Sequence, residues 1–258
     1  MNPEEYDIMA RTEDHHWWYR GLRKYMTTIL DRYGQSLPDI PTVLDAGCGT
    51  GANLRCLSDY FSSANSSGFD INPTSLENTR LKNPNLDIYA SDICQPILHR
   101  KAYDLIISMD VIYMIGVNKA LEGLKTMAHA LNPGGLLIIN VPAMKWLFSE
   151  HDRAVHTKQR FSTKDMSSLA EQLDLEVVHI SYRCFFLFPL IVLSRLPTMF
   201  GRAPETTKAT SDVTLPPPLI NTLFTSVMKL ENFGFHFGLK YLWGSSVTLV
   251  ARKPATLL

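Results

Sequence analysis

Three alternating glycines follow closely on a carboxylate at the end of an apolar run: Asp45, Gly47, Gly49 and Gly51. Glycine lets a backbone turn sharply and approach a ligand, because it has no Cβ. With Ala52, the first two glycines also satisfy the GxGxxA pattern of dinucleotide-binding turns, in which a pyrophosphate lies at a helix N-terminus. Asp45 and the third glycine favour a ligand that carries an ammonium group, since a carboxylate attracts a cation and repels a pyrophosphate.

A second group of side chains that could do chemistry lies within residues 150–162, in the run EHDRAVHTKQRFS. Histidine titrates near neutral pH, so His151 or His156 could take a proton from an acceptor, with Asp152 orienting the base. The alternative interpretation is a surface loop with two solvated histidines. The spacing of these three residues matches no established zinc or iron site, and we predict no metal.

The elements that must position these residues are short apolar runs alternating with amphipathic stretches, which predicts a parallel sheet covered by helices. The runs that we expect to be strands are 42–46, 67–71, 86–90, 103–109, 136–141, 175–182 and 245–252. The stretches that we expect to be helices are 17–33, 52–61, 73–81, 117–131, 163–173 and 219–233. Asn72 and Ser162 are predicted N-caps, and Pro73 suits a first helical turn because its missing N–H needs no partner there.

Further carboxylates follow the second and third predicted strands. Asp70 lies about 20 residues after the glycine turn, the distance at which two adjacent parallel strands place their carboxyl ends side by side. Asp92 follows the next strand in the run SDI. The polar cluster follows the fifth strand, and open α/β sheets bind their ligands at that edge.

This combination resembles the class I S-adenosylmethionine-dependent methyltransferases over residues 43–141, with specific motifs, and more weakly at both ends. The resemblance implies an α/β, Rossmann-like, doubly wound sheet of seven strands with an antiparallel last strand and a mainly helical insert before that strand. It also implies that the glycine turn and Asp45 hold the methionine part of the cofactor, that Asp70 binds the ribose hydroxyls and that Asp92 contacts the adenine.

Other segments support the same resemblance, and one departs from it. Residues 103–112, with Asp104 near the start, resemble the family's fourth strand, and residues 131–135 (LNPGG) resemble the tight turn into the fifth. The family commonly has Glu-His after the Asp-Val pair that ends strand four, whereas this chain has Asp110-Val111-Ile112-Tyr113. The departure leaves cofactor binding intact and weakens the case for a catalytic role of this turn.

A bacterial subgroup of the family, many of whose members act in natural-product or cell-surface sugar pathways, has a His-Trp-Trp element near its start and a His-Asp…His…Arg-Tyr/Phe-Ser signature. The start of the 17–33 helix here is HHWWYRGLR. One interpretation is ordinary packing of a helix on the sheet, and the other is a lid in which Tyr19 and Arg23 contact the cofactor. The resemblance favours the lid and implies that Trp146, Arg160 and Phe161 contact the acceptor.

The complete prediction is a methyltransferase that moves a methyl group from S-adenosylmethionine to the O, N or C atom of a small molecule and releases S-adenosylhomocysteine. The catalytic candidates are His151, His156 and Asp152. The implied cofactor contacts are Tyr19, Arg23, Asp45, Gly47, Cys48, Gly49, Gly51, Asp70, Ile71, Asp92, Ile93 and Met109. The rival functions are a nicotinamide-dependent oxidoreductase, which would lack the usual Tyr-x-x-x-Lys pair, and a non-catalytic subunit that binds the same cofactor.

Two regions are expected in the chain. Residues 1–184 with 245–258 should form the methyltransferase domain, and residues 185–244 should form an insert that is a lid, an acceptor pocket or a dimer surface. The apolar half of the insert (CFFLFPLIVL) is too short and too interrupted to span a membrane, because a span needs roughly 20 apolar residues. Peripheral contact with a membrane stays possible.

Composition restricts the partners. The 25 Lys and Arg residues balance the 25 Asp and Glu residues, so net charge gives no attraction to nucleic acid or anionic membranes. The four cysteines have no CxxC or Cys/His spacing, and the acidic start has no basic and apolar leader, so we expect a reduced, cytoplasmic protein. We expect a monomer or a homodimer.

Overall fold

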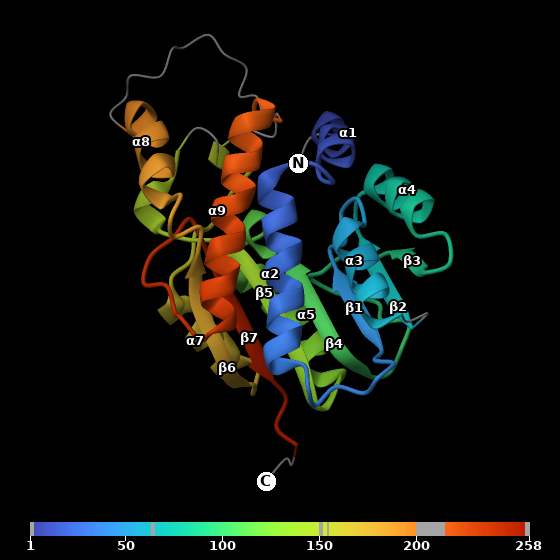
Figure 1. Ribbon diagram of the computed structural model, residues 1–258. Helices are drawn as coiled ribbons and strands as arrows, with labels where there is room; N and C mark the ends of the chain where they lie inside the picture. The colour runs from blue at the N-terminus through green and yellow to red at the C-terminus, as the bar shows by residue number, and fades with distance from the viewer. Residues whose placement is uncertain (1–2, 63–64, 150–151, 154, 200–214, 256–258) are drawn as a thin grey trace.

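The protein folds around one seven-stranded sheet. A computed structural model describes residues 3–62, 65–149, 152–153, 155–199 and 215–255 (Figure 1). The strand order is β3-β2-β1-β4-β5-β7-β6, and β7 is antiparallel to both its neighbours. The strands are β1 (Val43–Ala46), β2 (Ser66–Asp70), β3 (Asp87–Ala90), β4 (Tyr103–Met109), β5 (Leu131–Pro142), β6 (Glu176–Arg183) and β7 (Ser246–Arg252). The predicted fold class is confirmed.

Helices and short 3₁₀ segments connect the strands, and the sequence predicted most of them to within two or three residues at each end. They are α1 (Pro3–Thr12), α2 (Trp17–Tyr33), α3 (Ala52–Phe61), α4 (Pro73–Lys82), η1 (Ile112–Met114), α5 (Val117–His129), η2 (Lys145–Leu147), α7 (Thr163–Gln172), α8 (Phe188–Met199) and α9 (Pro218–His236). The Asn72 side chain caps α4 by accepting from the Ser75 N–H, and Ser162 forms a capping box with Asp165, so both predicted caps are confirmed.

Two expectations about local structure need correction. The sequence did not predict helix α1, because this short, polar segment has no N-cap or apolar stripe strong enough to indicate a helix. The expected tight turn at residues 131–135 is instead part of β5, where Leu131 pairs with Tyr103 before the register shifts. Gly134, with a φ of +82°, absorbs the irregularity inside the strand.

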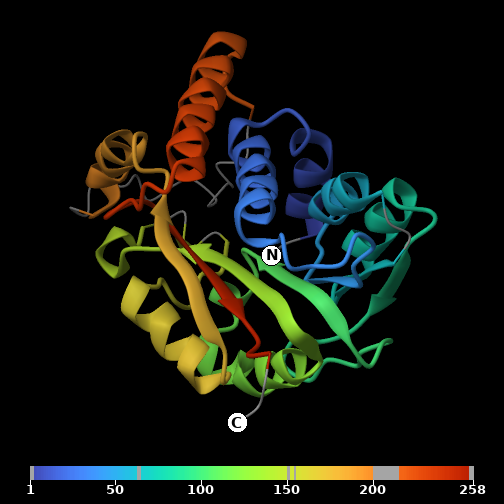
Figure 2. The same ribbon diagram turned by 60° about the horizontal axis from the view of Figure 1, so that its bottom comes forward.

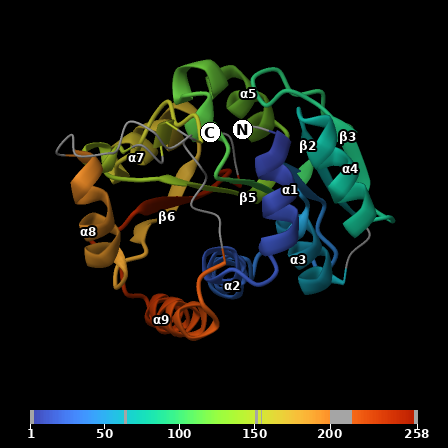
Figure 3. The same ribbon diagram turned by 90° about the horizontal axis from the view of Figure 1, so that it is seen from above.

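Helices cover both faces of the sheet, each over its own apolar core (Figure 3). Helices α5 and α7 pack on one face through buried side chains that include Leu124, Met127 and Leu169. Helices α2 and α9 lie side by side on the other face, where Met26 and Phe235 join the same core (Figures 1 and 2). Burial on both faces explains the nearly continuous apolar runs in β4 and β5.

The residues expected to form an insert are anchored to the rest of the chain. The Glu231 carboxylate of α9 accepts hydrogen bonds from the backbone N–H groups of Cys184 and Phe185, both at 2.7 Å, and so fixes the end of β6. The Asn232 amide of α9 donates to the Gly21 carbonyl of α2 at 3.1 Å. The outer face of α9 exposes apolar side chains, including Leu219, Leu223, Leu230 and Phe233. No helix in the described part of the chain is long and apolar enough to cross a membrane.

Candidate functional site

A cavity of about 670 Å³ opens at the carboxyl ends of the parallel strands. This volume falls within the range of small-molecule sites. Helices α1 and α2 supply part of its wall, and α8 contributes Ile191 and Arg195. These lining residues place the cavity between the sheet edge and helices α1, α2 and α8. Figures 1 and 3 show how these helices are arranged around the sheet.

The predicted glycine turn forms one wall of the cavity. Gly47 has a φ of +82°, and a Cβ there would lie 2.6 Å from a Val111 methyl group. The N–H groups of Gly47 and Cys48 both donate to the Phe69 carbonyl, which ties the turn to β2. Gly47, Cys48 and Gly49 line the cavity, whereas Gly51 lies behind them at the start of α3, packed against Thr79 and Asn83.

Asp45 lies beneath this turn and is buried. Neither of its carboxylate oxygens has a hydrogen-bond partner among the described residues. Burial, and then the nearby charge of Asp70, raise the pKa of Asp45 to about 8. A buried carboxylate without a partner is unfavourable unless a cation or a donor approaches it.

Asp70 ends β2 and lines the cavity. One carboxylate oxygen accepts from the Gly49 N–H at 3.0 Å, and the other accepts from the Asn72 N–H at 2.8 Å. Burial raises its pKa, and these hydrogen bonds oppose that change. The structure thus joins the end of β2 to the glycine turn, as the spacing predicted.

The ends of β3 and β4 complete the wall. Asp92 is exposed and its carboxylate accepts from the Cys94 N–H at 2.9 Å, while Ile93 is buried. Both residues line the cavity, as do Ile71 and Met109. The structure therefore gathers most of the expected cofactor contacts around one space.

The two residues of α2 that were expected to contact the cofactor differ in position. Tyr19 lines the cavity, but Arg23 does not. The Arg23 guanidinium donates to the Glu13 carbonyl at 2.7 Å and lies 3.8 Å from the Asp14 carboxylate. Arg23 therefore braces the turn between α1 and α2 instead of facing the cavity.

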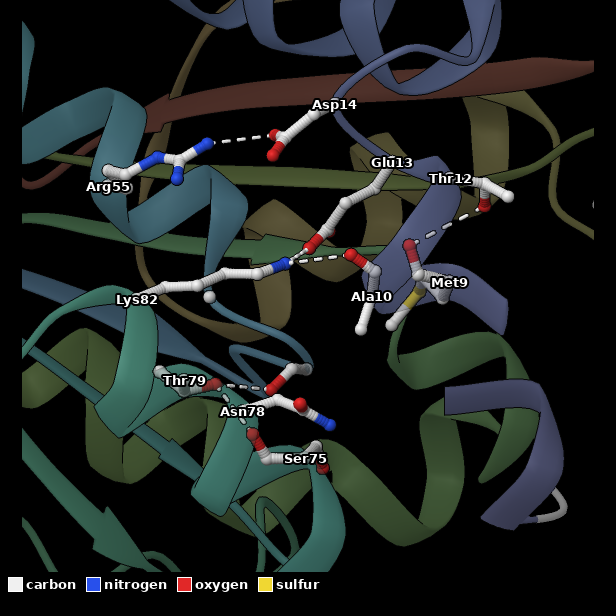
Figure 4. A network of polar contacts seen from close by, with 12 residues as sticks. Met9, Ala10, Thr12, Glu13, Asp14, Arg55, Ser75, Asn78, Thr79 and Lys82 are labelled. Atoms are coloured by element: carbon white, nitrogen blue, oxygen red, sulfur yellow. Dashed lines mark hydrogen bonds and ion pairs between the residues drawn. The ribbon is translucent and has the colours of Figure 1, made fainter. Parts of the chain in front are cut away.

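Polar contacts hold that turn over the glycine loop (Figure 4). Lys82 of α4 pairs with Glu13 and donates to the Ala10 carbonyl, and Arg55 of α3 pairs with Asp14 at 2.8 Å. The Thr79 hydroxyl donates to the Gly49 carbonyl at 2.6 Å. Helix α1 is consequently fixed to the helices that follow the glycine turn and β2.

On the far side of the cavity, Asp152 and Arg160 form a buried ion pair. The guanidinium donates through Nε and Nη2 to the two carboxylate oxygens, at 2.8 and 3.1 Å, and Arg195 of α8 reaches the same carboxylate at 3.1 Å. Burial would raise the pKa of Asp152, but the hydrogen bonds and charges of the arginines lower it below its usual value. Asp152 is engaged with arginines and has no contact with a histidine among the described residues.

Three further acceptor-side candidates, namely His156, Trp146 and Phe161, are not part of the cavity wall. His156 is exposed on a turn with a φ of +57°, and it is not part of the cavity wall. Trp146 is 52% exposed and packs edge-on against Phe188, and Phe161 is fully buried in the core. His151 lies outside the described residues. No group of three or more His, Cys, Asp or Glu residues that could hold a metal occurs in the described ranges.

The structure brings forward a residue to which the sequence assigned no role. Asp110 follows β4, lines the cavity and has a φ of +55°. Desolvation by burial raises its pKa to about 6. The signal in the sequence is an acidic residue at the end of a parallel strand, the same signal that identifies Asp70, but this turn lacks the family's usual Glu-His pair.

Comparisons with known proteins agree with this geometry. Residues 18–180 match the model of a family described as a methyltransferase domain. A malonyl-[acyl-carrier protein] O-methyltransferase of Acetivibrio thermocellus is 29% identical over 132 residues, which are 48% of this chain and 43% of that protein. The chain thus matches less than half the length of that curated relative.

Two solved structures have a fold similar to that of this chain. A complex between the Haloferax volcanii Trm112 methyltransferase activator and a protein assigned as a methyltransferase contains a chain with a TM-score of 0.62 and 19% identity, covering 99% of this chain and 98% of that one. Phosphoethanolamine N-methyltransferase 2 of Haemonchus contortus, solved with S-adenosyl-L-methionine, gives a TM-score of 0.56 at 18% identity and covers 88% and 52%. At these identities the likeness concerns the fold.

Proposed function

The chain belongs to the methyltransferase domain family, and from that premise we propose that it transfers a methyl group from S-adenosylmethionine to a small, largely apolar acceptor bound in the cavity. S-adenosylmethionine supplies an electrophilic methyl group on a sulfonium centre. The residues of this chain bind and orient the two reactants, exclude water and manage the acceptor's proton.

The observation that carries the proposal is the Asp45 carboxylate, which has no hydrogen-bond partner among the described residues and lies beneath the glycine turn. The glycine turn and Asp70 together line one side of the cavity. The group that fits must offer a hydrogen-bond donor or a positive charge, because burial and the charge of Asp70 raise the pKa of Asp45 when no such group is bound. It must also fit against the backbone of Gly47, which lines the cavity. The cofactor has an amino group, a sulfonium and ribose hydroxyls, so its chemistry suits this set of donors and acceptors.

We assign the cofactor contacts accordingly. The glycine turn faces the methionine part, with Asp45 beneath it and outside the cavity wall, while Asp70 faces the ribose hydroxyls and Asp92 with Ile93 the adenine. Met109 and Tyr19 border the reacting region. Arg23 is left out, because its guanidinium is engaged with the turn between α1 and α2.

The acceptor would occupy the remaining part of the cavity, whose wall includes Trp17, Trp18, Val155 and Ile191. These side chains favour an acceptor with an apolar body. Helices α2 and α8 would exclude water from above it. The O-methyltransferase relative makes an oxygen acceptor a reasonable first choice, and the subgroup resemblance directs a search toward specialised metabolites and sugar- or lipid-linked intermediates.

Calorimetric titration with S-adenosylmethionine, S-adenosylhomocysteine and NADH in parallel tests the proposal. We expect micromolar binding of the first two and none of NADH. Binding of NADH alone would overturn the proposal in favour of a nicotinamide-dependent enzyme. Binding of S-adenosylmethionine without release of S-adenosylhomocysteine across a broad acceptor panel would instead support the non-catalytic subunit.

A further inference from the structure

Asp110 occupies an unusual position for an aspartate. It is the first residue after β4 and has a left-handed backbone, with a φ of +55°. Such a conformation costs a non-glycine residue about 1 to 3 kcal/mol and persists only where surrounding contacts impose it. Here the Asp110 N–H donates to the Asn140 carbonyl of β5 at 2.9 Å. The sheet therefore holds this carboxylate at the wall of the cavity.

A buried chain of hydrogen bonds also orients the carboxylate. The Asn140 amide nitrogen donates to Asp110 Oδ1 at 2.8 Å, and the Thr248 hydroxyl donates to the Asn140 amide oxygen at 2.7 Å. Asn140 and Thr248 are fully buried. The Thr248 bond fixes the Asn140 amide so that its nitrogen faces Asp110 and holds Oδ1 in place. The other carboxylate oxygen, Oδ2, has no hydrogen-bond partner among the described residues.

Asp104, near the start of the same strand, shows what a purely structural aspartate does. Its Oδ1 accepts from the Asn132 amide at 2.7 Å, and its Oδ2 accepts from the Thr42 N–H at 2.8 Å. Both oxygens have partners within the fold, and Asp104 is not part of the cavity wall. Asp110 has the same kind of amide partner on one oxygen only, and the other oxygen is left for a ligand.

We propose that Asp110 is the proton acceptor of the reaction and that the acceptor presents an O–H or N–H group to it. This inference rests on the proposed function and narrows its acceptor from O, N or C to a hydroxyl or an amine. The proton of that group passes to Asp110 Oδ2, and the electron pair left on oxygen or nitrogen forms the new bond to the methyl carbon. The carbon–sulfur bond breaks, and its electron pair stays on sulfur.

The charges around Asp110 are compatible with this role. Desolvation raises the pKa of Asp110 to about 6, and the Asn140 hydrogen bond and the positive charge of Arg183 limit the rise. The other titratable groups that interact with it are Tyr113 of η1 and Cys184 after β6, and burial raises the pKa of both, so both are neutral near pH 7. At that pH Asp110 is ionised and able to accept a proton.

Sinefungin provides a direct probe, because it matches S-adenosylhomocysteine except that a carbon bearing an ammonium group replaces the sulfur, so that the ammonium stands in the place of the transferable methyl group. The experiment measures the Kd of sinefungin and of S-adenosylhomocysteine for the wild type, Asp110→Asn and Asp104→Asn at pH 7.5 and pH 5. Asparagine tolerates the left-handed backbone, so Asp110→Asn removes the charge and little else. The two ligands share their other parts, so titration of Asp45 or Asp70 affects both alike.

We expect the preference of the wild type for sinefungin to fall about tenfold in Asp110→Asn at pH 7.5, because a charge-assisted hydrogen bond is lost. The same preference should fall in the wild type between pH 7.5 and pH 5, and should be independent of pH in Asp110→Asn. Asp104→Asn should keep the wild-type preference. An unchanged preference in Asp110→Asn, with S-adenosylhomocysteine still bound, would overturn this inference alone. Failure of the wild type to bind S-adenosylhomocysteine would overturn the proposed function and this inference together.

Turnover gives a second readout. With an alcohol or amine acceptor identified by transfer of a labelled methyl group, kcat in Asp110→Asn should fall about 10²- to 10⁴-fold, the usual contribution of a general base. The acid limb of the pH profile, near pH 6 in the wild type, should disappear. Turnover within threefold of the wild type would show that Asp110 accepts no proton.

Discussion

The parts of the cavity wall that we assign to the cofactor and to the acceptor, called here the cofactor half and the acceptor half, are constructed differently. The cofactor half uses the glycine turn that follows β1 and residues at or just after the carboxyl ends of β2 and β3, such as Asp70. The acceptor half joins segments far apart in the chain. Asp152, Arg160 and Arg195 meet there around one carboxylate, and the start of α2 is bound by α9.

This difference determines which changes each half tolerates. Backbone conformation and the Asp45 carboxylate, which has no hydrogen-bond partner among the described residues, carry the cofactor half, so small changes there should affect ligand binding more than stability. Buried polar contacts over long sequence distances hold the acceptor half together, so changes there should affect stability more than cofactor binding. The predictions below test this contrast.

The largest expected effect is at the buried ion pair. Asp152→Asn leaves the guanidiniums of Arg160 and Arg195 without their shared carboxylate and should lower the free energy of unfolding by about 3 to 5 kcal/mol. The pKa of Asp152 is lowered in the fold, so its stabilisation is present above its unfolded-state value near 4 and is lost as pH falls through the folded value. Urea unfolding at pH 7 and pH 3 should show a difference between the proteins that shrinks in acid.

The control is the exposed pair of Lys145 and Asp165, at 3.2 Å with Lys145 64% exposed. Lys145→Ala should change stability by less than about 1 kcal/mol. Affinity for S-adenosylhomocysteine should stay within about threefold of the wild type in both variants. A loss of affinity in Asp152→Asn as large as its loss of stability would remove the distinction between the two halves.

The second prediction concerns the glycine turn. Gly47→Ala puts a methyl group 2.6 Å from Val111 and should weaken binding of S-adenosylhomocysteine by about 100-fold, or about 3 kcal/mol. Gly134 has the same φ of +82°, but nothing lies within 4 Å of an added Cβ. Gly134→Ala therefore measures backbone strain alone and should lower stability by about 1 kcal/mol without changing affinity. If calorimetry gave equal affinities for the two variants, close packing of Val111 against Gly47 would not be needed for binding.

The same contrast explains how much the sequence could predict. The spacing of Asp70 and the glycines along the chain predicts that they lie together, because it fixes their positions at one edge of the sheet, and the Gly49 N–H does donate to Asp70. Their roles toward a cofactor stay a prediction. His156, Trp146 and Phe161 could not be placed, because whether a loop residue faces a cavity depends on contacts with distant helices. Helix α8 contributes Arg195 to the Asp152 cluster, and no local pattern connects residues 43 positions apart.

The third prediction separates stability from binding at Asp45. Its pKa is raised to about 8, so the stabilisation that its protonated form provides is complete below about pH 4 and is lost as pH rises toward 8. Without ligand, Asp45→Asn should therefore equal the wild type near pH 4 and exceed it by about 1 to 3 kcal/mol at pH 8.5. The same variant should bind S-adenosylmethionine about tenfold more weakly, because the attraction to a cation is lost. Thermal unfolding and calorimetry at both pH values measure the two effects, and a variant that is less stable at pH 8.5 would show that Asp45 has a partner in the ligand-free protein.

The smallest effect should come from the contact between α9 and α2. Asn221 accepts from the Trp17 N–H and donates to the His15 carbonyl, both at 2.9 Å, and so connects two segments more than 200 residues apart. Removing both bonds in Asn221→Ala should cost about 1 to 2 kcal/mol. Because the loss is at the acceptor half, hydrogen exchange of the Trp17 amide should accelerate while affinity for S-adenosylhomocysteine stays constant.

Asn78→Ala is the matched control, since the Asn78 amide donates to the Thr74 carbonyl within α4 at 3.1 Å and to no other residue in the described ranges. It should leave the Trp17 amide unchanged, although α4 lies close to α1 (Figure 4). If Asn78→Ala accelerated exchange at Trp17 as much as Asn221→Ala does, the start of α2 would depend on the cofactor half and not on α9. The acceptor half would then have no scaffold of its own, and variation in α9 could not change the acceptor pocket without changing cofactor binding.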